Sequence, residues 1–273
     1  MPIAITGATG KLGSLVIHRL LQQVPSEQII ACVRQPEKAA RYAELGIEVR
    51  VCDYDDPDTI GKALQGASKL LLISGSNPED TIRMRQHAHV IEEAKKAKVE
   101  HLLYTSFAFA ESGKNLMTHM HLATEHAIKA SGIPYTLLRN ALYSDFVGAL
   151  GLDAAIAQGE LVVPPGDWVF NTVTRDDLAD GIAEVLTGPD HQSKTYEFTA
   201  SITWNFTQLT EVLSEKAGKK VSLRYDPEKR NWLYGFLRTI DTSSTSADLA
   251  TLIGRPAASL KESILPYLNC DAL

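Results

Sequence analysis

The sequence predicts an α/β fold: a doubly wound parallel sheet, followed by a smaller C-terminal α/β region. Short, nearly continuous apolar runs alternate with helical segments through the first half of the chain, as expected when strands are buried on both faces of a sheet. Right-handed crossovers between such strands leave the Rossmann-type arrangement as the economical topology. With 273 residues, 44% of them hydrophobic, the chain can bury the core that this fold requires.

The strands and helices expected in the first half follow one another with little interruption. Apolar runs predict strands at residues 3–5, 29–33, 47–51, 70–73, 102–104 and 135–138. Helical patterns lie between them, at residues 15–21, 37–45, 57–65, 80–97 and 120–131. The last of these helices is expected to end at Gly132, with Pro134 beyond it, which is a common helix exit. We assign residues 1–140 to this core.

Residues 141–273 are expected to form a smaller substrate-binding region that is intertwined with the core. Helices are predicted near residues 145–157, 176–187, 207–217 and 259–268, and short strands near 161–163, 195–198 and 221–225. Turns are predicted at residues 164–167 and 188–190, where proline and glycine cluster. Ligands of open α/β sheets bind at the carboxyl ends of the strands, so we expect this region to cover that edge.

Composition excludes several classes of partner. The net charge is −6 and no stretch is dense in lysine and arginine, which argues against nucleic acid. No apolar run approaches the about 20 residues of a membrane span, and the first strand begins at residue 3, without a signal peptide. Three cysteines (Cys32, Cys52 and Cys270) fit a reducing compartment, with Cys32 and Cys52 as small buried side chains. We expect a soluble cytoplasmic protein and leave a homodimer open.

The first strand leads directly into the turn Gly7-Ala8-Thr9-Gly10-Lys11-Leu12-Gly13. Glycines at this spacing suit a tight bend, a close approach of the backbone to a pyrophosphate, and close packing of the next helix. The amino end of that helix would then face the phosphates. The turn therefore predicts a dinucleotide site, and its candidate contacts are Gly7, Thr9, Gly10, Lys11 and Leu12.

The end of the second strand indicates which dinucleotide is bound. NAD-binding proteins normally place an acidic residue there for the ribose 2′-hydroxyl, whereas this strand ends in Arg34. A guanidinium suits a 2′-phosphate and stacks on adenine. Lys11 adds a nearby charge, with ordinary solvated surface an equal alternative, and Lys38 is a weaker candidate. The sequence favours NADP(H) over NAD(H).

Polar residues at three further strand ends should line the same crevice. Asp53 could accept a hydrogen bond from adenine, or it could instead cap the helix that begins near Pro57. The other candidate cofactor contacts lie at the ligand-facing ends of strands, and Asn140 follows the sixth strand. They are Tyr54, Ser74, Gly75, Ser76, Thr105, Ser106 and Asn140. A plain turn is the alternative for residues 74–76.

Several of these residues together resemble a known family. The glycine-rich turn, Arg34, residues 53–54 and residues 71–75 resemble the atypical short-chain dehydrogenase/reductases of the NmrA-like group. Residues 121–125 (HLATE) and 133–146 (IPYTLLRNALYSDF) are similar to type-2 NADPH:quinone oxidoreductases and, above all, to triphenylmethane reductases. The likeness continues at residues 207–209 and 252–256. Residues 225–248 look shorter than their counterpart, which puts the shape of the acceptor pocket in question.

The resemblance implies an NADPH-dependent reductase of quinones or of related flat, electron-poor aromatics, such as cationic triphenylmethane dyes. Typical short-chain dehydrogenases carry a Tyr-x-x-x-Lys proton-donor pair, and here the matching helix offers His121 and Glu125 instead. Hydride transfer to a dye carbocation needs no proton, and a quinone can take one later from water. His121 could donate to a quinone oxygen and Glu125 could hold a ribose hydroxyl. The alternative for both is an exposed pair on a polar helix face.

Two further questions stay open at this stage. His119, His121, Glu125 and His126 do not share one helix face, so we expect no metal site. Asn140 could meet the nicotinamide amide. The candidate aromatic walls of an acceptor pocket are Phe107, Phe109, Tyr143, Phe146 and Trp168, with core packing as an alternative for Tyr143. The competing function is an NmrA-like redox sensor, which would bind NADP(H) without turnover and signal through a protein partner.

Overall fold

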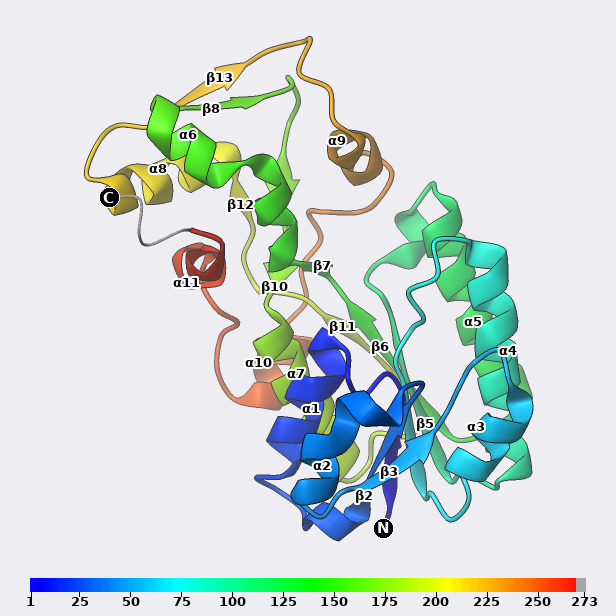
Figure 1. Ribbon diagram of the computed structural model, residues 1–273. Helices are drawn as coiled ribbons and strands as arrows, with labels where there is room; N and C mark the ends of the chain where they lie inside the picture. The colour runs from blue at the N-terminus through cyan, green and yellow to red at the C-terminus, as the bar shows by residue number, and fades with distance from the viewer. Residues whose placement is uncertain (269–273) are drawn as a thin grey trace.

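The computed structural model describes residues 1–268 and is built on one parallel sheet (Figure 1). Its seven strands lie in the order β11-β6-β5-β4-β1-β2-β3, and every neighbouring pair is parallel. Their bounds are β1 Ile3–Ile5, β2 Ile29–Val33, β3 Glu48–Val51, β4 Lys69–Leu72, β5 His101–Phe107, β6 Tyr135–Asn140 and β11 Lys194–Phe198. The strand order reverses between β1 and β4, which is where open α/β sheets bind ligands. The predicted Rossmann-type fold is confirmed.

Helices cover both faces of this sheet, and each face has its own core. One core joins the sheet to the helices α1 (Lys11–Leu20), α2 (Ala40–Glu44), α7 (Arg175–Thr187) and α10 (Asp248–Ile253). The other joins it to α3 (Pro57–Ala63), α4 (Asp80–Lys96) and α5 (Leu116–Ser131). Strand alternation divides the side chains between the faces, so Ile3 and Ile5 belong to the first core and Ala4 to the second.

A third core belongs to a smaller region that follows β6 in the chain (Figure 1). Its elements are α6 (Leu152–Gln158), β8 (Glu160–Val163), β9 (Val169–Phe170), β12 (Trp204–Asn205), α8 (Phe206–Ala217), β13 (Ser222–Tyr225), α9 (Trp232–Leu237) and α11 (Leu260–Ile264). Two short parallel strands, β7 (Leu142–Tyr143) and β10 (Thr172–Val173), lead into and out of it. Aromatic rings centred on Phe170 fill this core.

Three predicted helices are shorter or interrupted. The one expected at 145–157 is a 3-10 segment, Ser144–Leu150, followed by α6, because the backbone turns left-handed at Gly151 (φ +73°). The one at 259–268 is α11 followed by a 3-10 turn, Leu265–Tyr267, and the one at 37–45 begins as the 3-10 turn Pro36–Ala39. Proline stands at the start of both 3-10 turns.

The strand predicted at 195–198 is found as β11, and it extends the main sheet beside β6. The sheet therefore takes one edge strand from beyond residue 140, and our division of the chain at that residue stays a prediction. Cys32 and Cys52 are buried free thiols, as expected, and Cys270 lies outside the described residues. None of the helices within residues 1–268 combines the length and the apolar character of a membrane span.

Candidate functional site

The glycine-rich turn has the geometry that its spacing predicts. Gly7 adopts a left-handed φ of +60°, and its carbonyl oxygen accepts a hydrogen bond from Gly10 N at 2.9 Å. A Cβ on Gly13 would lie 2.4 Å from that same oxygen, so α1 can approach the turn only because residue 13 is glycine. Gly10 is the N-cap of α1 and brings no side-chain acceptor, which leaves the N–H groups of the first turn free for an anion.

Arg34 lies at the end of β2, exposed and without an ion pair among the described residues. A free guanidinium at this position suits a 2′-phosphate. Lys11 has a partner on another element: its Nζ lies 3.7 Å from Asp145, which follows β7. The side chain of Lys11 is 80% exposed, so this weak pair leaves both of the earlier alternatives open.

The end of β3 is tied to the end of β4. The Tyr54 hydroxyl donates to the Ile73 carbonyl oxygen at 2.9 Å, which holds the two strand ends together. Asp53 accepts from Asp55 N at 3.1 Å and is not the cap of α3. That cap is Asp56, whose side chain accepts from Asp58 N. Capping is therefore wrong as the alternative for Asp53, and its contact with adenine stays a prediction.

The ends of β4 and β5 are joined by side-chain bonds. Ser74 N donates to Thr105 Oγ1 at 2.9 Å, and Gly75 N donates to the ring nitrogen Nε2 of His87 at 3.0 Å. Arg83, which sequence analysis missed, donates from Nη2 to Ser74 Oγ at 2.8 Å. These bonds hold the β4 end in one conformation, while Ser76 remains exposed.

Asn140 provides the test of whether a nicotinamide dinucleotide fits. The residue is 2% exposed at the carboxyl end of β6, and its Oδ1 atom is enclosed without a hydrogen-bond partner among the described residues. A buried amide oxygen without a donor is costly, and the carboxamide of a nicotinamide would supply one. Together with the open amino end of α1, this orphaned atom fits the group.

His121 is buried beside β5. Its Nδ1 atom lies 2.8 Å from the Tyr104 hydroxyl, and its ring packs 6.2 Å from that of Phe107. Burial lowers the pKa of His121 to about 3, and the nearby Arg83 and His87 add to the shift. The imidazole is therefore neutral at physiological pH, so it can donate a hydrogen bond but carries no dissociable positive charge.

Comparisons with known proteins agree with this geometry. A family model described as NAD(P)H-binding matches residues 7–189. This chain belongs to that NAD(P)H-binding family. Quinone oxidoreductase 2 of Escherichia coli is 38% identical over 98% of this chain and 99% of its own length. The NmrA-like oxidoreductase flvB of Aspergillus flavus is 30% identical over 97% of this chain and 92% of its own length.

Among solved structures, the Citrobacter sp. triphenylmethane reductase complexed with NADP(H) superposes with a TM-score of 0.92. It is 43% identical, with 98% of this chain and 100% of that chain covered. The predicted resemblance to NmrA-like reductases is confirmed, and so is the class of NAD(P)H-dependent oxidoreductases.

Glu125 shows where this member of the NAD(P)H-binding family departs from our expectations. It is 1% exposed, so the exposed helix pair with His121 is wrong. Its Oε1 accepts from Ser106 Oγ at 2.6 Å and from Arg139 Nε at 2.8 Å, and its Oε2 accepts from Arg139 Nη2 at 2.6 Å. Because protein donors already engage both oxygens, this geometry gives no support to a ribose contact by Glu125 or Ser106.

The candidate walls of the acceptor pocket fall into two groups: Phe109 and Tyr143 pack against the first core, and Phe107, Phe146 and Trp168 pack against the core of the smaller region. Phe107 flanks His121, and Tyr143 lies under the guanidinium of Arg175, whose Cζ is 4.4 Å from the ring centroid. Phe146 and Trp168 are partly buried, and their rings pack against Phe170. Phe109 adopts a left-handed φ of +49° and its N–H donates to Glu197.

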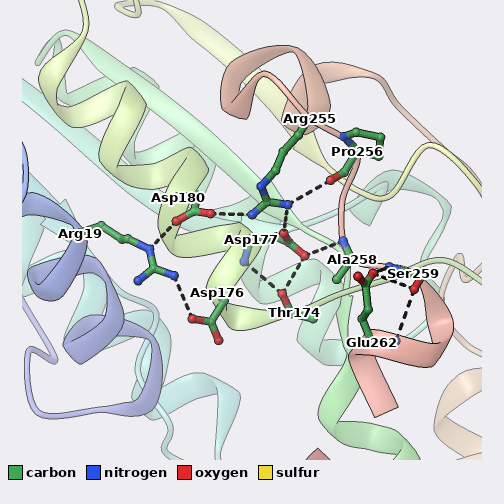
Figure 2. Close-up of polar contacts among 10 residues, drawn as sticks. All are labelled: Arg19, Thr174, Asp176, Asp177, Asp180, Arg255, Pro256, Ala258, Ser259 and Glu262. Carbon is green, nitrogen blue, oxygen red and sulfur yellow. Dashed lines mark hydrogen bonds and ion pairs between the residues drawn. The ribbon is translucent and has the colours of Figure 1, made fainter. Parts of the chain in front are cut away.

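A cavity of about 970 Å³ lies next to α1 and the start of α7. Asp176, Asp177 and Arg255 line it and belong to the ion-pair network in Figure 2, in which Arg255 bridges Asp177 (2.7 Å) and Asp180 (2.6 Å). Arg19 of α1 pairs with Asp180 and Asp176 on the other side. The network fastens the C-terminal segment to α7 and α1. Within the described residues, no three His, Cys, Asp or Glu side chains gather as a metal site would require.

Proposed function

We propose that this protein transfers hydride from NADPH to quinones and related flat, electron-poor aromatics, cationic triphenylmethane dyes among them. The printed names of its relatives, a quinone oxidoreductase and a triphenylmethane reductase, support this class of acceptor. The observation that carries the proposal is the neutral, buried imidazole of His121 in place of a proton-donating tyrosine. Acceptors of this class take hydride without a simultaneous proton transfer.

The cofactor is proposed to be NADP(H) in preference to NAD(H). Support comes from the free, exposed guanidinium of Arg34 where NAD-binding chains normally carry an acid, and from NADP(H) in the complex of the triphenylmethane reductase. The open amino end of α1 would receive the pyrophosphate, and Asn140 Oδ1 the carboxamide. When bound, the reduced nicotinamide supplies the hydride.

The protein's own contribution is to bind and orient the acceptor. Phe107 and Tyr143 offer aromatic surface at the ends of β5 and β7, which suits a flat ring. His121 would donate a hydrogen bond to a quinone oxygen as negative charge develops there. Since burial lowers its pKa to about 3, the ring is neutral and has no imidazolium proton to give, so the quinone oxygen is protonated from water afterwards. A dye carbocation needs neither step.

A redox sensor is the second candidate, and one observation favours it. Phe146 and Trp168 use part of their ring surface on Trp204 and Phe170 of the smaller region, so less aromatic surface is available to an acceptor than the sequence suggested. A protein that only binds NADP(H) would need no such lining. The glycine-rich turn and Arg34 would serve both functions equally.

The deciding experiment mixes purified protein with NADPH and a panel of small quinones and one cationic dye, and follows the loss of reduced-nicotinamide absorbance. Turnover with at least one acceptor supports the reductase. Tight NADPH binding by calorimetry without turnover on the whole panel would favour the sensor. Arg34→Ala serves as the binding control, because it should weaken NADPH binding under either function.

We also propose a cytoplasmic location, without a nucleic-acid or membrane partner, on the basis of the net charge of −6 and the lack of a spanning helix in residues 1–268. Fractionation of cells and detection with an antibody would test the location. Analytical ultracentrifugation would show whether two copies associate.

A further inference from the structure

We infer that Tyr104 is a positioning residue that holds His121 in the tautomer with hydrogen on Nε2, so that this N–H faces the acceptor. The inference rests on the proposed function and adds to it a residue that is not among the candidate contacts named from the sequence. Tyr104 is fully buried in β5 and on the face of the sheet that α4 and α5 cover. From there its hydroxyl reaches His121 Nδ1 at 2.8 Å.

The direction of this hydrogen bond follows from the available acceptors. A buried hydroxyl must donate its hydrogen, and the hydrogen-bond partner of the Tyr104 hydroxyl in residues 1–268 is His121 Nδ1, whereas the nearby Ser74 Oγ already accepts from Arg83. The neighbouring Thr124 hydroxyl donates to Met120 O at 3.0 Å and receives a bond from His87 Nδ1. Tyr104 therefore donates, Nδ1 of His121 is the unprotonated nitrogen, and the ring hydrogen lies on Nε2.

His87 supplies an internal check on this assignment. Gly75 N can only donate, so His87 Nε2 accepts and its Nδ1 carries the hydrogen that reaches Thr124. The two buried histidines are thus held in opposite tautomers by different partners. With His87 donating to Thr124, no hydrogen of His87 is directed at the Tyr104–His121 bond.

The Nε2 atom of His121 is accessible. The enclosed side-chain polar atoms without a partner in residues 1–268 are Arg83 Nε, Asn140 Oδ1 and Ser144 Oγ. His121 is 5% exposed, and its Nε2 atom has no protein partner in the same residues and is not one of these enclosed atoms, so Nε2 is left available to a ligand. Half-buried Phe107 stands beside the ring, which places the free N–H next to one of the aromatic walls.

The surroundings of Tyr104 keep it a donor. Burial raises the pKa of the Tyr104 phenol, although the Ser74 and Thr124 hydroxyls and the charge of Arg83 act in the opposite direction. Arg83 also donates to Ser74 Oγ at 2.8 Å. The positive charge of Arg83 therefore lies on the buried side of Tyr104, and the Nε2–H of His121 lies on the side of the acceptor. Such an arrangement polarises each bond toward the acceptor.

The chemical balance is that of a hydrogen bond and not of a proton transfer from the protein. A quinone gains two electrons and one hydrogen as hydride, the C=O bond opens to an oxyanion, and His121 stabilises that oxyanion through Nε2–H. The oxyanion then takes one proton from water. A dye carbocation develops no oxyanion, so its reduction should be indifferent to the tautomer of His121.

Two measurements test the inference. In the wild-type protein with selectively ¹⁵N-labelled histidine, His121 should show a protonated Nε2 and an unprotonated Nδ1, with its resonances assigned by their loss in His121→Gln. In Tyr104→Phe we expect both tautomers to be populated. The kcat for a quinone should fall about tenfold, while the KM for the quinone and the kcat for the dye stay unchanged. The fall is smaller than the roughly 10² expected when the donor itself is lost, because His121 is still present.

Tyr196→Phe is the matched control, because it removes the same group from a second Tyr–His pair. The Tyr196 hydroxyl lies 2.8 Å from His191 Nδ1, on β11 and away from the crevice, so both reactions should be unaffected. A protonated Nδ1 in wild-type His121 would overturn the inference, even if Tyr104→Phe fails to fold. Equal losses with quinone and dye would make Tyr104 merely structural. If no acceptor oxidises NADPH, the proposed function fails, and the tautomer is still decided by the spectrum.

Discussion

Removal of the Arg34 side chain should separate the two nicotinamide cofactors. In Arg34→Ala, we expect NADPH to bind about 2 kcal/mol more weakly, the scale of one lost charge-assisted hydrogen bond, whereas NADH should be almost unaffected. At 1.4 kcal/mol per tenfold change, this is roughly a 30-fold rise in the Kd for NADPH. NADH has no 2′-phosphate, so it loses nothing that Arg34 would hold.

The structure makes this substitution a clean perturbation. Arg34 is exposed and forms no ion pair within residues 1–268, so its removal breaks no contact that stabilises the fold. Lys38 is exposed on the neighbouring 3-10 turn and carries the same charge, which makes Lys38→Ala the matched control. If only the general positive potential mattered, the two variants would lose similar affinity, and both losses would shrink with added salt.

Isothermal titration calorimetry of both cofactors against wild type, Arg34→Ala and Lys38→Ala would measure these differences. We expect a loss confined to NADPH and to the Arg34 variant. Equal losses for NADPH and NADH in Arg34→Ala would remove this residue from the 2′-phosphate site. An unchanged NADPH affinity would place the phosphate elsewhere and would leave the preference without an explanation in β2.

Three other predictions follow from the same geometry. His121→Ala should lower the kcat for a quinone by up to ~10²-fold and leave the single-turnover rate with a cationic dye unchanged. His119→Ala, at an exposed position, is the control. An equal fall in the dye rate would mean that His121 only positions its neighbours. The pKa values of His121 and His87 are about 3 in the folded protein and 6.5 in the unfolded chain. As the pH falls below 6.5, the unfolded chain takes up protons that the folded protein does not, so the free energy of unfolding decreases. Urea unfolding should show a loss of about 2 kcal/mol per histidine by pH 5, and His121→Ala should lose less than wild type over that range; equal losses would contradict the assignment. Gly13→Ala should weaken NADPH binding and stability together, because the added Cβ would meet a carbonyl oxygen at 2.4 Å, whereas Gly235→Ala, with open space around it, should leave binding unchanged by calorimetry.

The parts of the fold that depend on local pattern could be predicted. Each strand of the core is a short apolar run between breakers, and the glycine-rich turn requires a left-handed residue at Gly7 and no side chain at Gly13 whatever surrounds them. The position of β11 at the edge of the main sheet could not be foreseen in the same way. Residues 194–198 are separated from β6 by more than fifty residues, and only their pairing in space places them there.

The contacts between side chains of the site could not be predicted, because they depend on which face of the sheet each side chain occupies. Tyr104 stands in the run Leu102-Leu103-Tyr104 and has the composition of core, so nothing local marks it as a partner of His121. Arg139 likewise lies near the end of an apolar strand. Ser106 of β5 pairs with Arg139 of β6, so both side chains lie on the face of the sheet that α5 covers. There, both donate hydrogen bonds to Glu125. That register is known only once the order of the strands is known.

Electrostatics connect the missing Tyr-x-x-x-Lys pair to the range of acceptors that we propose. At the position of the lysine stands Glu125, whose charge is balanced by Arg139, and at the position of the tyrosine stands His121, which is neutral. The nearby Arg83 is paired with Asp80 at 3.2 Å. A cationic dye therefore meets no unpaired cation at positions 121 and 125, whereas a lysine at position 125 would repel it. A neutral quinone still finds a hydrogen-bond donor in His121, so one uncharged site can accept both kinds of molecule.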